Sequence, residues 1–148
     1  MAKFAVRVAA FALACLFGSG VLQSASTQEP HKAGEGMICS WAIYTLMDQV
    51  GSRCFPGRDP EAQAELGRIL AAIDTYVAAN ASPKMSDADR AQFKREQGGI
   101  GRPKEQLCQG DAVQMYQGIV KQGRQALSEA RQKVESEKPG QPTWGVCL

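Results

Sequence analysis

Four cysteines beyond the N-terminal segment constrain the fold of this 148-residue chain more than any other feature. They are Cys39, Cys54, Cys108 and Cys147, and a fifth, Cys15, lies in an apolar stretch near the N-terminus. An even number of cysteines in an exported chain predicts two disulfide bonds. A zinc site would need closely spaced ligand pairs such as Cys-x-x-Cys, and these four residues are far apart along the chain. The cysteines therefore predict a domain that two covalent cross-links hold together.

Export is predicted because residues 1–26 have the three parts of a secretory signal peptide. Lys3 and Arg7 supply positive charge, an uncharged apolar run follows, and small residues at 24–26 offer a cleavage site. The apolar run is too short to span a bilayer, so we expect no stable membrane insertion after cleavage. The predicted location of the mature protein is the periplasm or the extracellular space.

Charge argues against one class of partner. The whole chain has 17 basic and 15 acidic residues, and the predicted signal peptide carries two of the basic residues and no acidic one. The mature chain therefore has no net charge when its histidine is neutral. Because it lacks the basic footprint of a nucleic-acid-binding protein, we do not expect nucleic acid as a partner.

Hydrophobic periodicity predicts a single all-α domain in residues 37–148. Apolar residues recur there at three- and four-residue spacing, as on the buried face of a helix. The predicted fold class is a disulfide-stapled helical bundle of three main helices and one short helix, with an extended C-terminal tail. The main helices are predicted at 37–50, at 60–80 and from a cap at Asp111 to Pro139, and the short helix at 86–97. An additional earlier turn at 104–108 is an alternative for the start of the last helix. The polar residues 27–36 are predicted to be a flexible leader with no packing role.

Local signals mark the ends of two of these helices. Asp59 is placed to cap the first turn of the second helix, and Pro60 suits its first position. Ser86 and Asp89 have the spacing of a capping box, with Asp where Glu or Gln is preferred. These signals predict where the second helix and the short helix begin.

Helix geometry selects among the disulfide pairings. A helix rises about 1.5 Å per residue, so Cys39 and Cys54 lie about 22 Å apart if the first helix continues to Cys54. A disulfide requires Cα atoms within about 7 Å of each other. With neighbouring helices antiparallel, the predicted pairs are Cys54–Cys108 and Cys39–Cys147. The alternative, Cys39–Cys54 with Cys108–Cys147, requires the first helix to break near Gly51.

The last predicted helix carries a heptad-like seam of apolar or small residues. The seam comprises Tyr116, Val120, Gly123, Leu127, Ala130 and Val134. It is short and has few branched residues, which favours a helix of a monomeric bundle. A coiled-coil dimer is the alternative.

The sequence shows no catalytic, metal-binding or cofactor-binding constellation. His31 is the single histidine and lies in the predicted leader, and the cysteines are committed to disulfides. Asp48 and Asp74 each lie beside an apolar stripe and are the best candidates for carboxylate-dependent hydrolysis. We therefore expect a non-enzymatic protein without a cofactor, with a small cell-wall hydrolase as the less favoured alternative.

The expected function is binding to another protein or to a component of the cell envelope. The candidate binding surface consists of the aromatic residues Trp41, Phe93 and Trp144. An alternative is a stress chaperone that opens in acid, because 15 acidic groups in a chain without net charge leave it strongly positive once they are protonated.

Overall fold

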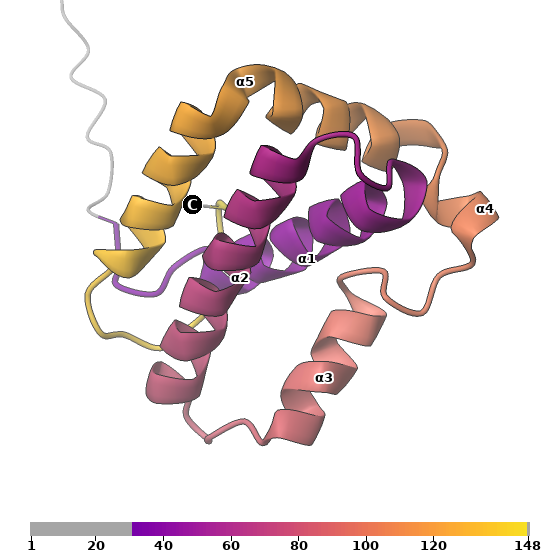
Figure 1. Cartoon of the computed structure of the whole chain (residues 1–148). Helices are drawn as coiled ribbons and strands as arrows, with labels where there is room; N and C mark the ends of the chain where they lie inside the picture. The colour runs from indigo at the N-terminus through magenta and orange to yellow at the C-terminus, as the bar shows by residue number, and fades with distance from the viewer. Residues whose placement is uncertain (1–30, 148) are drawn as a thin grey trace, which may run out of the picture.

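The computed structural model describes residues 31–147, and within them the chain forms five α-helices and no strand (Figure 1). The helices are α1 (Met37–Cys54), α2 (Pro60–Asn80), α3 (Asp87–Glu96), α4 (Lys104–Leu107) and α5 (Gly110–Glu135). The predicted all-α, disulfide-stapled fold is confirmed, with α4 as an additional single turn before α5. The predicted signal peptide and residues 27–30 of the predicted leader lie outside the described residues.

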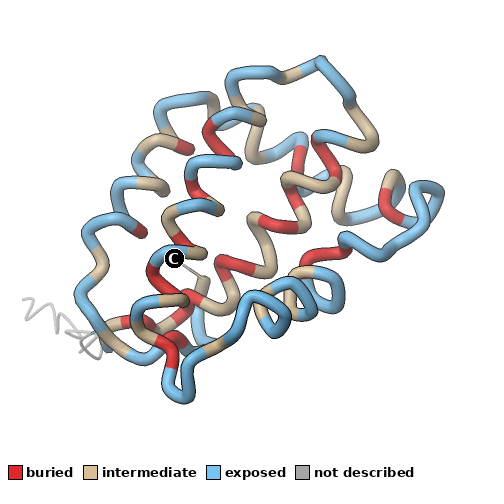
Figure 2. The backbone as a smooth tube through the Cα atoms, turned by 60° about the horizontal axis from the view of Figure 1, so that its bottom comes forward, coloured by how far each residue is buried: buried red, intermediate tan, exposed pale blue. Residues whose placement is uncertain are grey.

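The hydrophobic core lies between α1, α2 and α5, whose facing sides are buried (Figure 2). Its largest fully buried side chains are Trp41, Tyr116, Met37, Met47, Leu66, Ile69 and Ile73. Burying one large apolar side chain stabilises a fold by about 1.5–3 kcal/mol, so this three-helix core provides most of the stabilisation. Within the described part of the chain, every helix is too short or too polar to cross a membrane.

Two disulfide bonds join distant parts of the chain. Cys39 pairs with Cys147 at a Cα–Cα distance of 5.1 Å, and Cys54 pairs with Cys108 at 5.4 Å. This is the predicted pairing. Helix α1 continues through Gly51 to Cys54 without a break, which keeps Cys39 and Cys54 at its opposite ends.

The starts of α2 and α5 differ from the predicted caps. Asp59 precedes α2, but its side chain makes no capping hydrogen bond. Its carboxylate instead accepts a hydrogen bond from the Tyr116 hydroxyl of α5 at 3.1 Å. Gln109 occupies the position before α5, so Asp111 lies inside the first turn. A tertiary partner has therefore replaced the local role that the sequence predicts for Asp59.

The described end of the predicted leader packs against the C-terminal tail. The Thr143 amide donates to the Gly34 carbonyl at 3.0 Å, and the Ile38 amide donates to the Thr143 carbonyl at 3.2 Å. Gly34 is buried, and a Cβ atom added to it would lie 2.5 Å from the Gln141 carbonyl oxygen. The expectation of no packing role is therefore wrong for residues 33–36, because the tail lies directly against their backbone.

Helix α5 changes direction at Gly123, where φ is 83° and ψ is 172°. This backbone conformation is almost restricted to glycine. The predicted seam is therefore not one continuous helical stripe. Tyr116 before the break, and Leu127 and Val134 after it, are all buried in the core of their own chain.

Gly123→Ala is expected to lower the free energy of unfolding by about 1–3 kcal/mol, because a Cβ atom disfavours this conformation. Gly118→Ala is the matched control in the same helix, since nothing lies within 4 Å of a Cβ atom added at either position. Gly118 has no positive φ, so alanine there is expected to stabilise by about 0.5–1 kcal/mol. Urea unfolding followed by circular dichroism measures both changes. Stabilisation by both substitutions would show that α5 does not need the break.

Candidate binding site around helix α3

Helix α3 is the helix least embedded in the fold, since none of its residues is buried. Ser86 and Asp89 form the predicted capping box, in which each side chain accepts a hydrogen bond from the other residue's backbone amide. After the helix, Gly98 and Gly99 are buried against α1. A Cβ atom on Gly98 would lie 2.2 Å from the Thr45 methyl carbon. Close packing of the chain after α3 therefore fixes the helix, although none of its own residues is buried.

The three aromatic residues of the predicted binding surface lie together beside α3. Phe93 stacks on Trp41 with ring centroids 4.4 Å apart and an interplanar angle of 15°. Trp144 is tilted against Phe93, with centroids 6.1 Å apart. We call these three rings the aromatic cluster. The prediction is wrong in one respect: Trp41 is fully buried because it belongs to the core, so only the outer part of the cluster faces solvent.

Trp144 forms the exposed end of the aromatic cluster. It is 57% exposed, and Val146, two residues further along the tail, is 87% exposed. The tail does not hang free, because Thr143 is hydrogen-bonded to Gly34 and Cys147 is cross-linked to α1. A fixed aromatic side chain loses little conformational freedom on binding. The tail therefore presents a preorganised apolar surface.

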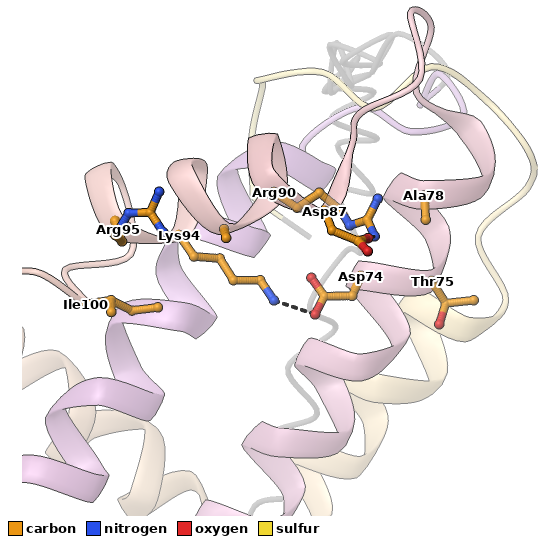
Figure 3. Close-up of a pocket in the computed structure, with 9 residues that line it drawn as sticks. Asp74, Thr75, Ala78, Asp87, Arg90, Lys94, Arg95 and Ile100 are labelled. Carbon is orange, nitrogen blue, oxygen red and sulfur yellow. Dashed lines mark hydrogen bonds and ion pairs between the residues drawn. The ribbon is translucent and has the colours of Figure 1, made fainter.

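A groove of about 590 Å³ lies between α3 and α2 (Figure 3). Its walls are Asp74, Thr75 and Ala78 of α2, Asp87, Arg90, Ala91, Lys94 and Arg95 of α3, and Ile100 after α3. The α3 residues recur every three or four positions and so share one face of the helix. Three cationic and two acidic side chains therefore line the same groove.

Lys94 reaches across this groove. Its Nζ atom lies 2.5 Å from Oδ2 of Asp74, and Figure 3 shows the ammonium group pointing toward the carboxylate on α2. The same Nζ atom lies 5.7 Å from the centre of the Trp41 ring. Oδ1 of Asp74 is buried and has no hydrogen-bond partner within residues 31–147. Lys94 thus lies between the groove and the aromatic cluster.

Two arginines accompany Lys94 on this face of α3. Arg90 donates a hydrogen bond to the Met85 carbonyl at 2.8 Å and forms an ion pair with Asp87, whose side chain is 95% exposed. An ion pair with so exposed a partner contributes little stability. Arg95 is exposed and makes no hydrogen bond or ion pair with any described residue. Arg95 is therefore the cation of this groove that no described residue neutralises.

The two carboxylates considered for hydrolysis are placed differently. Asp74 lines the groove and is paired with Lys94, whereas Asp48 lies on α1 and does not line it. Burial raises the pKa of Asp48, while a hydrogen bond from Gln49 and the charge of Lys94 act in the opposite direction. A raised pKa suits a general acid, but Asp48 and Asp74 do not line the same groove.

Metal-ligand chemistry has no site in the described part of the chain. Residues 31–147 contain no cluster of three histidine, cysteine, aspartate or glutamate side chains that could hold a metal ion. His31 is exposed and lies 3.4 Å from a carboxylate oxygen of Glu137.

Periodicity alone does not single out Arg90, Lys94 and Arg95. The sequence shows only that their spacing places them on one face of the predicted short helix. A charged helix face is usually solvated, and only the fold shows that this one lies opposite Asp74.

Comparison with protein-family models, curated proteins and solved structures gives no match for this chain.

Proposed function

We propose that this chain is an exported, non-enzymatic protein that binds another protein or an envelope component through the surface around Trp144. The observation that supports this function is the aromatic cluster, in which an exposed tryptophan is backed by Phe93 and by the buried ring of Trp41. Tryptophans on well-packed supports are enriched among the residues that contribute most to binding.

Two further observations favour a role outside the cytoplasm. Residues 1–26 have the pattern of a signal peptide. Both disulfide bonds join residues far apart in sequence, and such bonds persist mainly in oxidising compartments. Both observations support the proposal that the protein is exported.

The surface around Trp144 differs from the other exposed apolar residues. Ile100 and Met115 are 39% and 41% exposed and belong to separate elements, as isolated apolar residues often do. Trp144 and Val146 lie two residues apart on a tail that a disulfide holds in place. This continuity favours the tail as the binding surface.

Trp144→Ala is expected to weaken binding by about 2 kcal/mol, or about thirtyfold in Kd, because it removes the exposed ring of the cluster. The oxidised mature protein is immobilised and incubated with solubilised envelope fraction. Retained components are identified by mass spectrometry, and their affinities are then measured after purification. Met115→Ala is the matched control, because it removes an exposed apolar side chain of α5 outside the cluster.

A component that the native protein and Met115→Ala retain and that Trp144→Ala loses would support the proposed function. Equal retention by all three proteins, with equal thermal unfolding midpoints, would exclude Trp144 as the binding residue. The same experiment with the reduced protein tests whether binding requires the disulfide that holds the tail in place.

A further inference from the structure

We propose that α3 is a lid that opens away from Trp41 while the three-helix core stays folded, and that a partner bound at Trp144 requires the open form. The first statement concerns the fold alone, whereas the second rests on the proposed function and adds a regulation to it. Both depend on the weak contacts that hold α3, the anchors at its two ends and the polar atoms beneath it.

The lid comprises residues 85–97, a segment that has no buried residue. Met85 and Phe93 are its side chains that pack against the core, and both stay partly exposed. In the described part of the chain, its one ion pair with another helix joins Lys94 to Asp74, whose side chains are 26% and 34% exposed. An ion pair that solvent reaches contributes little stability. The closed lid is therefore held mainly by the ring of Phe93 in the aromatic cluster.

Other contacts of the lid are internal and can move with it. Ser86 and Asp89 cap the helix from within the segment. Arg90 pairs with Asp87 and donates a hydrogen bond to the Met85 carbonyl. These interactions stay intact when the helix leaves its position, so α3 can open as a unit.

Buried anchors lie directly outside both ends of the lid. Ala81 is 6% exposed, and the Ser82 amide donates to the side-chain oxygen of Gln141 at 2.8 Å. At the other end Gly98 is packed against Thr45 of α1. The segment is thus tethered on both sides, and these tethers fix the position to which α3 returns.

Two polar atoms beneath the lid favour its opening. Nε1 of Trp41 and Oδ1 of Asp74 are buried and have no hydrogen-bond partner among residues 31–147. Phe93 stacks on the first of these side chains, and Lys94 pairs with the second. A polar atom buried without a partner costs free energy, which opening recovers by returning the atom to water. The groove between α2 and α3 already brings solvent to the ion pair (Figure 3).

Opening changes the surface that the chain offers beside Trp144. Phe93 is the middle ring of the aromatic cluster, since it contacts both Trp41 and Trp144. The two tryptophans belong to α1 and to the tail, which the Cys39–Cys147 bond joins, so both stay in place when Phe93 withdraws. An apolar side chain of a partner can then take the place of Phe93 and contact both rings. The closed lid therefore competes with the partner.

Hydrogen exchange of the oxidised protein alone, followed by NMR, tests the opening. The Trp41 indole N–H and the α3 amides are expected to share one protection factor, about 100-fold below that of the Met47 and Val50 amides, which exchange by global unfolding. Low urea concentrations should accelerate exchange of the Met47 and Val50 amides steeply and exchange of the lid and the indole only slightly, because opening exposes less surface than unfolding. An indole N–H as protected as these α1 amides would overturn the lid.

Lys94→Gln removes the ion pair and keeps the ring of Phe93. It is expected to raise exchange of the Trp41 indole and of the α3 amides by one common factor of about five or more, because Asp74 then loses its cation in the closed form. Gln92→Ala is the matched control on the lid, since this exposed side chain bonds to Glu96 of the same helix, and less than a twofold change is expected. Exchange of the indole that does not follow the α3 amides in Lys94→Gln would also overturn the lid.

The component that the native protein retains through Trp144 is the probe for the second statement. A partner that requires the open form binds in proportion to the open fraction, so Lys94→Gln should lower its Kd by the same factor by which it raises exchange. An unchanged or higher Kd together with faster exchange would overturn this requirement. Absence of any component that depends on Trp144 would refute the proposed function and the requirement with it, whereas exchange, measured without a partner, would still decide whether α3 is a lid.

Discussion

Cys54→Ser/Cys108→Ser is expected to lower the free energy of unfolding by about 4 kcal/mol. The bond joins residues separated by 54 positions, and the chain-entropy model assigns about 4 kcal/mol to the closure of such a loop. Single domains usually have a net stability of about 5–15 kcal/mol, so the variant is expected to be marginally stable. Urea unfolding of the oxidised native protein and of the variant, both followed by circular dichroism, measures the difference.

Cys39→Ser/Cys147→Ser is the companion variant. Its bond spans 108 positions, for which the same model gives about 5 kcal/mol. Reduction of the native protein should then destabilise it more than either double substitution. A loss below about 1 kcal/mol for Cys54→Ser/Cys108→Ser would show that the stacked rings of Phe55 and Tyr116, 5.4 Å apart, already hold this end of the fold together.

Glu65→Gln is expected to lower the free energy of unfolding by about 3 kcal/mol. Glu65 is only 2% exposed, its Oε1 atom accepts a hydrogen bond from Nε of Arg131 at 2.7 Å, and its Oε2 atom pairs with Arg68. Removing one partner of a buried ion pair typically costs about 3–5 kcal/mol, and the loss expected here lies at the lower end because Arg131 keeps its ion pair with Glu135 and Arg68 is 55% exposed. Glutamine keeps the shape of the side chain, so the loss reports on charge.

Glu61→Gln is the matched control, one turn earlier on the exposed side of α2, and is expected to change stability by less than about 0.5 kcal/mol. The hydrogen bond from Arg131 lowers the pKa of Glu65. A carboxyl group with a lowered pKa in the folded state stabilises the protein at neutral pH, and this contribution is lost as the pH falls through the lowered pKa. The difference between the native protein and Glu65→Gln should therefore shrink in acid. A stability difference that stays constant over the acid range would contradict an origin in the charge of Glu65. A difference that disappears in acid is the behaviour that an acid-opened stress chaperone requires.

The helices and the disulfide pairing can be predicted from the sequence because their signals depend on residues that are close together along the chain. Apolar spacing locates α1, α2 and α5, and the Ser86–Asp89 box locates the start of α3, because each signal depends on residues one turn apart. The pairing follows from the rise of a continuous α1, which separates Cys39 from Cys54. Excluding Cys39–Cys54 leaves two pairings, and the antiparallel order of neighbouring helices selects the observed one.

The site depends on contacts between residues far apart in sequence. Glu65 has the sequence position of an acid near the positive end of a helix, and nothing near it indicates that Arg131, 66 residues away, reaches it. Trp41 is predicted to belong to a binding surface, yet Phe93 of α3 stacks on it and its side chain is fully buried. Glycine at position 123 is compatible both with a seam of small residues along a continuous helix and with the break that α5 has there, so the residue type alone does not decide between them.

The nested disulfides also set an order of oxidation for a chain that enters an oxidising compartment from its N-terminus. Cys54–Cys108 lies inside Cys39–Cys147, so the inner bond can close while the residues after Cys108 are still arriving. Cys39 and Cys54 arrive first and meet before either native partner is present. Once α1 forms, it holds these two thiols about 22 Å apart, which is too far for a disulfide between them.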